Sequence, residues 1–420
     1  MQQEKKRRGA YPTDSRKERY ILVGVATESR EAEEASLSEL SALLETAGGE
    51  AVFTMIQSLD RPDPATYIGS GKAEELRPFI EMYEADGILC DDELTPAQIR
   101  NLTEFFHCAV IDRTILILDI FAKHARTNEG KIQVEMAQQK YRLSHLSGLG
   151  KSLSRQGGGI GTRGPGETKL ETDRRLIRKR IAALSGEISE MKRVRETKRR
   201  KREQNEIPVI AIIGYTNAGK STLLNRLTDS GVLAEDKLFA TLDPTTRTCR
   251  LAGGRKILLT DTVGFINKLP HHLIDAFRST LEEAKYADIL LHVVDISDPE
   301  ADRHIRTVYD TLSELGIREK PVLTVLNKTD LISAGRKEDI SVFRDPMARR
   351  IIKISAATGD GITELLSAVS GLLSEEEVLL DQIFPYDQSD AAARIRIEGR
   401  VISEEYLEDG IHIRAYVRHR

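Results

Sequence analysis

The chain has 420 residues, of which 40% are hydrophobic and 30% charged, with a formal net charge of −4, as in an ordinary globular protein of about three domains. Its three scattered cysteines exclude a disulfide framework and a metal-ligand spacing, and they favour a reducing cytoplasm. No run reaches the about 18 apolar residues of a transmembrane helix. Residues 1–19 are polar and lack the apolar region of a secretory signal, so they are predicted to be a disordered start.

Residues 20–128 are predicted to form a small α/β domain. Buried strands are expected at residues 20–26 and 51–56, with a helical pattern over residues 31–47. Because strands alternate with helices, a mainly parallel sheet is expected. The run Tyr67–Lys72 superficially resembles a phosphate-binding loop, but it lacks the spacer and the Ser or Thr after the lysine. A tight loop that opens a helix is therefore the preferred interpretation.

Residues 129–205 are predicted to form a basic helical hairpin. Amphipathic helical patterns cover residues 131–146 and 170–200, and residues 155–168 between them are too rich in glycine for a helix or a central strand. Two helices joined by such a loop form an antiparallel hairpin. Exposed backbone amides beside basic side chains suit phosphates or RNA edges, although a flexible hinge remains an alternative. The candidate RNA contacts are Arg155, Arg163 and Lys169.

The charge of this hairpin differs from that of the rest of the chain. Residues 151–202 hold 17 Lys and Arg against 6 Asp and Glu, a net charge of +11, which leaves −15 for the remainder. A basic segment in an otherwise acidic protein favours a polyanionic partner such as nucleic acid. A solvated, charged hairpin explains the same numbers, and charge alone does not choose between the two interpretations.

Residues 206–373 carry the most specific motif. The strand pattern of residues 207–213 runs into the sequence GYTNAGKS, from Gly214 to Ser221, and a helix follows. This is the full phosphate-binding motif in its required strand–loop–helix context. Loop amides and the helix N-terminus can surround phosphates, Lys220 can supply a point charge to the β and γ phosphates, and Ser221 can supply a hydroxyl to Mg²⁺.

A second motif predicts which base is bound. A strand over residues 322–326 ends in NKTD, where the carboxylate of Asp330 can accept hydrogen bonds from N1 and N2 of guanine. Adenine offers neither donor, so such a site can reject it by a factor of about 10⁴ or more. The stem of Lys328 can cover the base. A backbone N–H from residues 355–357, that of Ala356, is expected to reach guanine O6.

Two further segments complete the predicted site. Asp261 follows a strand and can hold Mg²⁺ through water, and the N–H of Gly264 can meet the γ-phosphate. Residues 239–243 form an upstream loop in which Thr241 is the preferred ligand of Mg²⁺, although spacing alone does not exclude residues 245–246. The five segments follow the order of Ras-like GTPases. The predicted GTP-binding residues are Gly214, Tyr215, Thr216, Asn217, Ala218, Gly219, Lys220, Ser221, Phe239, Ala240, Thr241, Leu242, Asp243, Asp261, Thr262, Val263, Gly264, Asn327, Lys328, Thr329, Asp330, Ser355, Ala356 and Ala357.

Residues 374–420 are predicted to form a small C-terminal α/β domain. Residues 393–399 and 410–418 alternate with period two, so they are expected to be a strand pair beside a short helix. Their basic side chains could meet RNA, although a solvated sheet face explains the same pattern. These side chains are Arg394, Arg396, Arg414 and Arg418.

With these motifs in place, the sequence resembles the HflX family of translation-associated GTPases, in the group that includes Obg. The resemblance rests on FATLDPT from Phe239, DTVGFI from Asp261, GTRGPGETKLETDRR from Gly161 and RTNEGKIQVE from Arg126. It implies a P-loop GTPase domain with a mainly parallel sheet, preceded by a small α/β domain plus helical hairpin and followed by a small α/β domain. It also implies binding to the large ribosomal subunit, with the glycine-rich loop near ribosomal RNA, and ribosome splitting or rescue under stress.

Three residues refine the expected mechanism. Thr241 matches the Mg²⁺-binding threonine of the family pattern. Ras-like enzymes commonly place a water-orienting glutamine where this chain has Phe265, whose ring cannot hydrogen-bond water. Slow intrinsic hydrolysis that a partner such as the ribosome stimulates is therefore expected, and no catalytic base is assigned; Lys220 and Gly264 support the transition state. Asn217 resembles the asparagine of cation-activated GTPases and suggests K⁺ beside the phosphates.

Other functions stay open at this point. The first alternative is a GTP-gated ribosome assembly or RNA-binding factor. A small-molecule P-loop kinase is disfavoured because Asp330 specifies guanine and no acceptor-site motif is present. The basic hairpin would also permit weak association with a membrane surface. No dimer seam is evident, so a monomer is expected.

Overall fold

The computed structural model describes residues 16–153, 165–203, 207–228, 238–239, 245–252, 254–269, 283–318, 320–332, 343–375, 377–398 and 400–418. The chain divides into two compact units, Met1–Ile117 and Leu118–Arg420. Most of the predicted disordered start, residues 1–15, lies outside the described residues. Residues 16–18 precede the first strand without regular structure.

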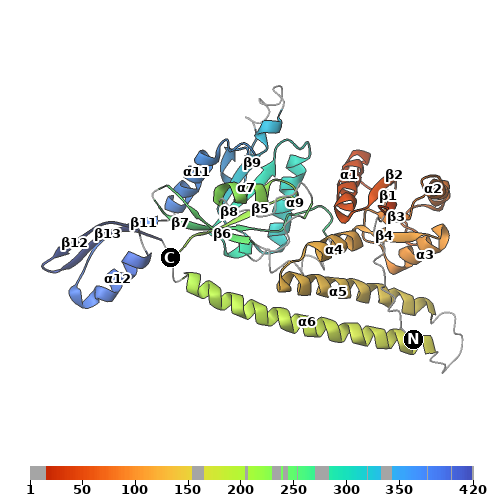
Figure 1. Cartoon of the computed structure of the whole chain (residues 1–420), viewed down its shortest axis with the longest axis horizontal. Helices are drawn as coiled ribbons and strands as arrows, with labels where there is room; N and C mark the ends of the chain where they lie inside the picture. Colours follow the sequence, from red (N-terminus) through yellow and green to blue (C-terminus); the bar gives the residue numbers. More distant parts are fainter. Residues whose placement is uncertain are drawn as a thin grey trace, which may run out of the picture. The chain divides into compact units, whose positions relative to one another are not determined.

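The first unit contains a four-stranded parallel sheet with the strand order β2-β1-β3-β4 (Figure 1). Strand β1 is almost entirely buried, which its unbroken apolar run predicts for a central strand. The parallel sheet expected here is confirmed. The strands are β1 Arg19–Ala26, β2 Glu50–Ser58, β3 Gly87–Cys90 and β4 Ala109–Asp112. The helices are α1 Arg30–Ala47, α2 Ser70–Met82, α3 Pro96–Phe106 and α4 Arg113–His124, the last of which runs past the end of the unit.

Local sequence signals set the ends of these helices. The side chain of Ser29 caps α1, and Gly48 ends it in a left-handed conformation with φ of 95°. The run Tyr67–Lys72 leads into α2, in agreement with the preferred interpretation. The ammonium of Lys72 pairs with Glu75 of the same helix at 2.9 Å. This ion pair holds the lysine against its own helix.

Two long helices, α5 (Asn128–Leu153) and α6 (Pro165–Glu203), lie side by side in the second unit (Figure 1). They share a small apolar core that includes Ile132, Met136 and Leu184. The expectation that residues 155–168 contain no helix is wrong for the last of these residues, because α6 begins at Pro165. Proline is well tolerated in a first helical turn, where its missing N–H has no partner to lose. None of the described helices is both long and apolar enough to cross a membrane.

A six-stranded sheet follows, with the order β10-β9-β8-β5-β7-β6. All neighbouring strands are parallel except β6 and β7, and this mainly parallel sheet confirms the predicted fold class. The strands are β5 Val209–Gly214, β6 Thr245–Arg250, β7 Lys256–Asp261, β8 Ile289–Asp295, β9 Val322–Asn327 and β10 Ala348–Lys353. The helices are α7 Lys220–Thr228, α9 Ala301–Glu314, α11 Ile362–Glu375 and the short 3₁₀ helix η1 Thr329–Leu331.

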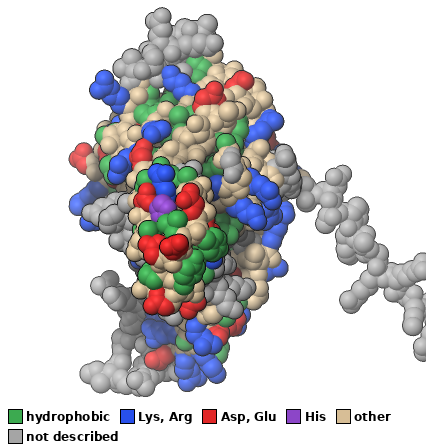
Figure 2. Space-filling model, turned by 90° about the vertical axis from the view of Figure 1, so that its left-hand side faces the viewer, with side chains coloured by type: hydrophobic (Ala, Val, Ile, Leu, Met, Phe, Trp, Pro, Cys, Tyr) green, Lys and Arg blue, Asp and Glu red, His purple; other side chains and the backbone are tan. Residues whose placement is uncertain are grey.

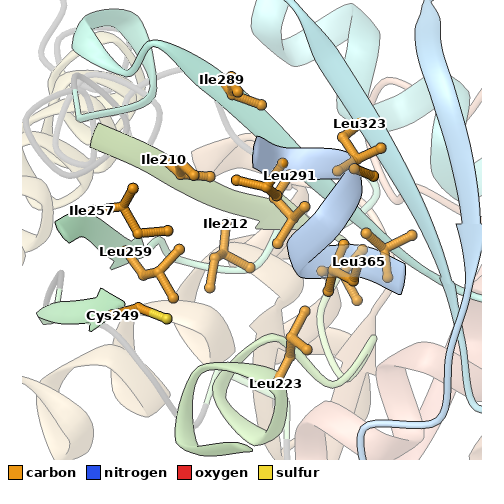
Figure 3. Packing of buried hydrophobic residues seen from close by; sticks show 14 of the residues in the cluster. Ile210, Ile212, Leu223, Cys249, Ile257, Leu259, Ile289, Leu291, Leu323 and Leu365 are labelled. Carbon is orange, nitrogen blue, oxygen red and sulfur yellow. The ribbon is translucent and has the colours of Figure 1, made fainter. Parts of the chain in front are cut away.

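The core beneath this sheet joins strands to the helices beside the predicted site. Figure 3 shows Ile210 and Ile212 of β5 with Leu291 of β8, next to Leu223 of α7 and Leu365 of α11. All five side chains are at most 1% exposed, and burial of each contributes about 1.5–3 kcal/mol. The packing fixes the carboxyl ends of β5, β7, β8 and β9 along one sheet edge, where parallel sheets bind ligands.

The C-terminal part is a three-stranded antiparallel sheet with one helix, in the order β11-β13-β12. Its elements are β11 Glu377–Phe384, the 3₁₀ helix η3 Tyr386–Gln388, α12 Ser389–Glu398, β12 Arg400–Leu407 and β13 Gly410–Arg418. The strand predicted at residues 393–399 is wrong, because most of it belongs to α12. Ala392 and Ile395, three positions apart, pack as one helical face in a cluster with Ile413. The short alternation of Arg and Ile hid this helical spacing.

Two of the four arginines singled out in this region pair within it. Arg396 pairs with Glu404, and Nε of Arg414 lies 3.0 Å from Asp381. The side chains of Arg394 and Arg418 lie outside the described part. In the view of Figure 2, acidic side chains lie among hydrophobic ones rather than apart from them. The paired arginines thus fit the solvated-face interpretation better than a free basic surface.

Candidate nucleotide-binding site

The motif GYTNAGKS forms the loop between β5 and α7. Gly214 and Gly219 have φ of 151° and 92°, a region that favours glycine. A side chain at Gly214 would collide with the carbonyl of Val293, and one at Gly219 with the amide of Asn327. Asn217 is exposed and also left-handed, with φ of 59°. The close contacts hold the loop against the ends of β8 and β9.

Lys220 opens α7 with a side chain that is only 7% exposed. Its ammonium donates a hydrogen bond of 2.6 Å to the carbonyl of Tyr215. Burial lowers the pKa of Lys220 to about 8, while the negative charge of Asp261 opposes this shift. A buried ammonium gains strongly from an anionic ligand, because phosphate oxygens replace the water that it has lost.

Ser221 and Asp261 provide the donor set for a divalent cation. The hydroxyl of Ser221 donates to Oδ2 of Asp261 at 2.7 Å. Among the described residues, Oδ1 of Asp261 is buried without a hydrogen-bond partner, and burial raises the pKa of this carboxyl. Such an oxygen is costly, and a water ligand of Mg²⁺ would satisfy it. The residues therefore fit Mg²⁺.

The described ranges contain no group of three His, Cys, Asp or Glu side chains that could hold a metal by themselves. Mg²⁺ keeps several waters and takes further ligands from the phosphates of a nucleotide.

The segment after β7 is fastened to the phosphate loop. The N–H of Thr216 donates to the carbonyl of Phe265 at 2.7 Å, and the N–H of Phe265 donates to the carbonyl of Gly214 at 3.1 Å. A Cβ on Gly264 would lie 2.9 Å from Nζ of Lys220 and from Thr216. Only glycine fits without displacement, so the backbone here runs directly beside the buried lysine.

Asn327 joins the phosphate loop to the predicted base site. Its Nδ2 donates to the carbonyl of Ala218 at 2.8 Å, and its Oδ1 accepts from the N–H of Ala356 at 2.9 Å. The N–H of Ala356 was expected to reach guanine O6, but in this structure it is engaged by Asn327. The spacing of the motifs could not show this contact, because it joins loops that are far apart in the sequence.

The neighbouring residues position the side chains expected to bind the base. Lys328 is left-handed with φ of 63°, and its ammonium lies 2.7 Å from Oδ2 of Asp295. The hydroxyl of Thr329 donates to the carbonyl of Ile354 at 2.9 Å and anchors η1. Asp330 in η1 is exposed, so its carboxylate is accessible to a ligand.

The upstream loop is described only in part. Phe239 is 3% exposed, and its ring packs edge-on against Phe121 of α4, with 4.6 Å between ring centres. The alternatives to Thr241, residues 245–246, lie in β6. The predicted residues Ala240, Thr241, Leu242 and Asp243 lie outside the described residues, as do Arg155 and Arg163, and the side chain of Lys169 is not described either.

The other predicted residues lie at the same sheet edge. Three of them have buried side chains, so they can offer a ligand only backbone groups: Thr262, Val263 and Ser355. Ala357 is exposed. The three buried side chains support the loops in which they lie.

Four residues beside the site lie outside the predicted motifs: Arg226, Asn267, Asp295 and His304. The ring of His304 in α9 stacks on the predicted residue Tyr215 with 3.7 Å between ring centres, and the Tyr215 hydroxyl accepts from the N–H of Asn267 at 2.8 Å. Arg226 of α7 donates to the carbonyl of Ala356 at 3.1 Å. Asp295, which pairs with Lys328, is the last residue of β8. Its position at the carboxyl end of a strand is the one sequence feature that could have indicated it, because parallel sheets bind ligands there.

Three family models match successive parts of the chain. They are described as GTP-binding GTPase N-terminal at residues 34–122, GTP-binding GTPase Middle Region at residues 124–202, and 50S ribosome-binding GTPase at residues 209–328. Among solved structures, the chain is similar to a GTP-binding protein from the archaeon Sulfolobus solfataricus in complex with GDP. That match has 26% identity and a TM-score of 0.43, and it covers 85% of this chain and 99% of that one.

The similarity to curated relatives extends over nearly the whole chain. It is 56% identical over 400 residues to a GTPase HflX of Lacrimispora saccharolytica, covering 95% of this chain and 93% of the relative. It is 41% identical over 405 residues to a GTPase HflX of Escherichia coli K12, covering 96% and 93%. With this similarity and a P-loop site of the geometry described, the chain belongs to the HflX family of GTPases and is a GTP hydrolase.

Proposed function

We propose that this chain is a Mg²⁺-dependent GTPase that binds the large ribosomal subunit in its GTP state and splits or rescues ribosomes under stress, in the cytoplasm. The nucleotide part rests on Asn327, whose two hydrogen bonds join the phosphate loop and the base loop into one site. The ribosomal part is supported by the 50S ribosome-binding GTPase model that matches residues 209–328. It is also supported by α6, whose 14 Lys and Arg against 7 Asp and Glu suit RNA phosphates.

The phosphate end of the site would stabilise charge during attack of water on the γ-phosphate. Loop amides and the ammonium of Lys220 bind phosphate oxygens, and the N–H of Gly264 reaches the γ-phosphate. Ser221 and Thr241 would hold Mg²⁺, with Asp261 acting through a water. When bound, the cation neutralises charge that develops on the phosphates. Preorganised donors of this kind account for most of the rate enhancement in such sites.

The base end of the site would select guanine. The exposed carboxylate of Asp330 can accept hydrogen bonds from N1 and N2 of the base. The pair between Lys328 and Asp295 holds the lysine stem in place, so that it can cover the face of the base.

Phe265 gives the reason to expect slow hydrolysis without a partner. Its side chain is 2% exposed, packed against the protein, and it carries no group that could orient water. A partner would have to supply or induce that function, and the large ribosomal subunit is the partner that we propose.

Nucleotide state would be transmitted through the upstream segment that contains Thr241. The γ-phosphate would hold Thr241 and Gly264, and hydrolysis would release them. Phe239, two residues before Thr241, is buried against Phe121 of α4. A change at Thr241 would therefore reach α4, which leads into the hairpin.

Several finer points stay predictions. K⁺ would sit beside the phosphates near Asn217, whose side chain is exposed. The protein would be a monomer, and its basic hairpin would permit weak contact with a membrane surface. The domain borders would separate residues 1–19, 20–128, 129–205, 206–373 and 374–420.

The test is GTP hydrolysis with and without purified 50S subunits and 70S ribosomes, for the wild type and for Asp330→Asn. We expect strong stimulation of the wild type and loss of GTP use by the variant, because an amide cannot accept both guanine donors. ATP should not replace GTP. The same assay in matched KCl and NaCl tests the potassium prediction, which equal rates would contradict.

The opposite result would change the partner rather than the chemistry. If neither 50S nor 70S stimulates an enzyme that still prefers guanine, ribosome splitting is wrong. The alternative, a GTP-gated assembly or RNA-binding factor, would then be favoured if subunit precursors or free ribosomal RNA bind instead.

A further inference from the structure

An open cleft of about 520 Å³ lies between α5 and α6, in the half of the hairpin near the glycine-rich segment. The α5 side of its lining includes Tyr141, His145 and Leu146. The α6 side includes Asp173, Leu176 and Ile177. These residues recur at helical spacing on both helices, so the cleft is a feature of the facing helical surfaces.

The cleft exists because the apolar seam of the hairpin ends before the helices do. Ile132 and Met136 of α5 pack on Leu184 and Ile181 of α6, and this cluster closes the helices against each other. Beyond it, Leu176 leaves 58% of its surface exposed. An apolar side chain in this position has surface to bury against a ligand.

One polar bridge crosses the helices beside the cleft. Nη2 of Arg174 donates to the carbonyl of Leu146 at 3.2 Å. Its Nε is buried and has no hydrogen-bond partner among the described residues. A buried guanidinium nitrogen without an acceptor is costly. The bridge fixes the spacing of the two helices at Leu146, which lines the cleft.

The lining has the chemistry of a nucleobase site. The rings of Tyr141 and His145 stack with 3.9 Å between their centres and 25° between their planes, which makes one wall flat and aromatic. Leu176 and Ile177 form apolar surface opposite, and the carboxylate of Asp173 can accept from an exocyclic amine. An acyl chain would use neither the aromatic wall nor the carboxylate.

We propose that this cleft binds one unstacked base of single-stranded RNA, with an adjoining phosphate on Arg142, which lines the cleft and is exposed. This proposal rests on the proposed function, because it takes RNA as the partner of the hairpin. The basic charge of α6 supplies the affinity for phosphates, and the cleft adds a preference for a base that has left its helix. Duplex RNA keeps its bases stacked and cannot enter.

The test compares two variants with the same change of charge on the same helix. Leu176→Glu alters the cleft, and Val194→Glu alters another exposed apolar side chain of α6, which is 46% exposed. Binding of the full-length protein, loaded with GDP or a non-hydrolysable GTP analogue, is measured with short single-stranded RNA that carries 2-aminopurine and with the matching duplex.

We expect the wild type to quench 2-aminopurine and to prefer the single strand. Leu176→Glu should bind the single strand about 5- to 150-fold more weakly than Val194→Glu does, which is the range of one lost base stack. Both variants should bind the duplex equally. His145→Ala should lower the affinity for the single strand in the same way. His145→Phe should restore this affinity, because the phenyl ring retains the stacking surface.

Two outcomes would overturn the proposal. The first is equal single-strand affinity of Leu176→Glu and Val194→Glu with both proteins folded by circular dichroism. The second is a different occupant of the cleft. A fluorescent fatty acid would then bind the wild type but not Leu176→Glu, while the two proteins bind RNA equally well. Failure of the proposed function is distinct, because it appears as a wild-type enzyme that 50S subunits do not stimulate.

Discussion

Lys220 and Asp261 are buried charges that each compensate part of the other's burial. Burial lowers the pKa of the lysine to about 8 and raises the pKa of the carboxyl, and the opposite charge of the partner counteracts each shift. The part of the burial cost that the two charges do not compensate indicates a site whose ligand supplies further charge. Phosphate oxygens and a hydrated cation supply it with the correct signs.

The shift of Lys220 predicts how nucleotide affinity depends on pH. In the free protein the ammonium begins to lose its proton near pH 8. A bound phosphate favours the charged form and raises this pKa, so binding above pH 8 takes up a proton. GDP affinity should therefore be flat below about pH 8 and fall by up to about tenfold per pH unit above it. Titration with a fluorescent GDP checks this.

The control for this prediction is guanosine, which has no phosphate and should compete equally well on both sides of pH 8. An affinity for GDP that stays constant through this range would contradict the assignment of Lys220 as the phosphate-binding cation.

Two kinds of contact hold α5 against α6. Leu184 is fully buried in the apolar cluster between the helices. Arg180 and Glu135 form a bidentate pair with distances of 2.7 and 2.8 Å, but their side chains are 48% and 36% exposed. Water and salt screen a pair of this exposure, whereas nothing replaces lost apolar packing.

We therefore predict unequal effects of two truncations in the hairpin. Leu184→Ala should destabilise it by about 2–5 kcal/mol, and Arg180→Ala should have a much smaller effect, because water and salt already screen its ion pair. Hydrogen exchange of the amides of α5 and α6 is the appropriate measurement, because a protein of several units has no single unfolding free energy. Equal effects of the two changes would contradict this prediction, because the ion pair would then contribute as much as the apolar seam.

On the scale of the whole molecule, charge is distributed very unevenly. Residues 151–202 carry a net charge of +11 in a chain of net charge −4. The basic segment lies mostly in α6, whereas the nucleotide site depends on the buried Lys220. Salt screens exposed charges far more than buried ones.

This separation predicts two different responses to salt. Affinity for 50S subunits or RNA should fall linearly with the logarithm of KCl concentration, because binding releases counterions from the phosphates. GDP affinity should change much less over the same range. Parallel titrations of both ligands give the slope of log affinity against log KCl concentration for each. An RNA affinity that does not change with KCl concentration would contradict an electrostatic role of α6.

Local patterns predicted much of this molecule correctly. The apolar run before Gly214 and the helix after Ser221 are a strand and a helix in the structure, because β5 and α7 depend on neighbouring residues. The prediction failed where a pattern was short. Ile395 belongs to α12 rather than to a strand. A segment this short fits the strand period and the helical period equally well, and packing on Ile413 favoured the helix.

The sequence by itself determined the family, the parallel sheet and the order of the nucleotide motifs, because each depends on residues that are close in the chain. Only the tertiary structure decided that Asn327 takes the N–H of Ala356, that Tyr215 stacks on His304, and that α5 and α6 leave a cleft. These contacts join residues far apart in sequence. Their geometry follows from how strands and helices pack, which no local spacing encodes.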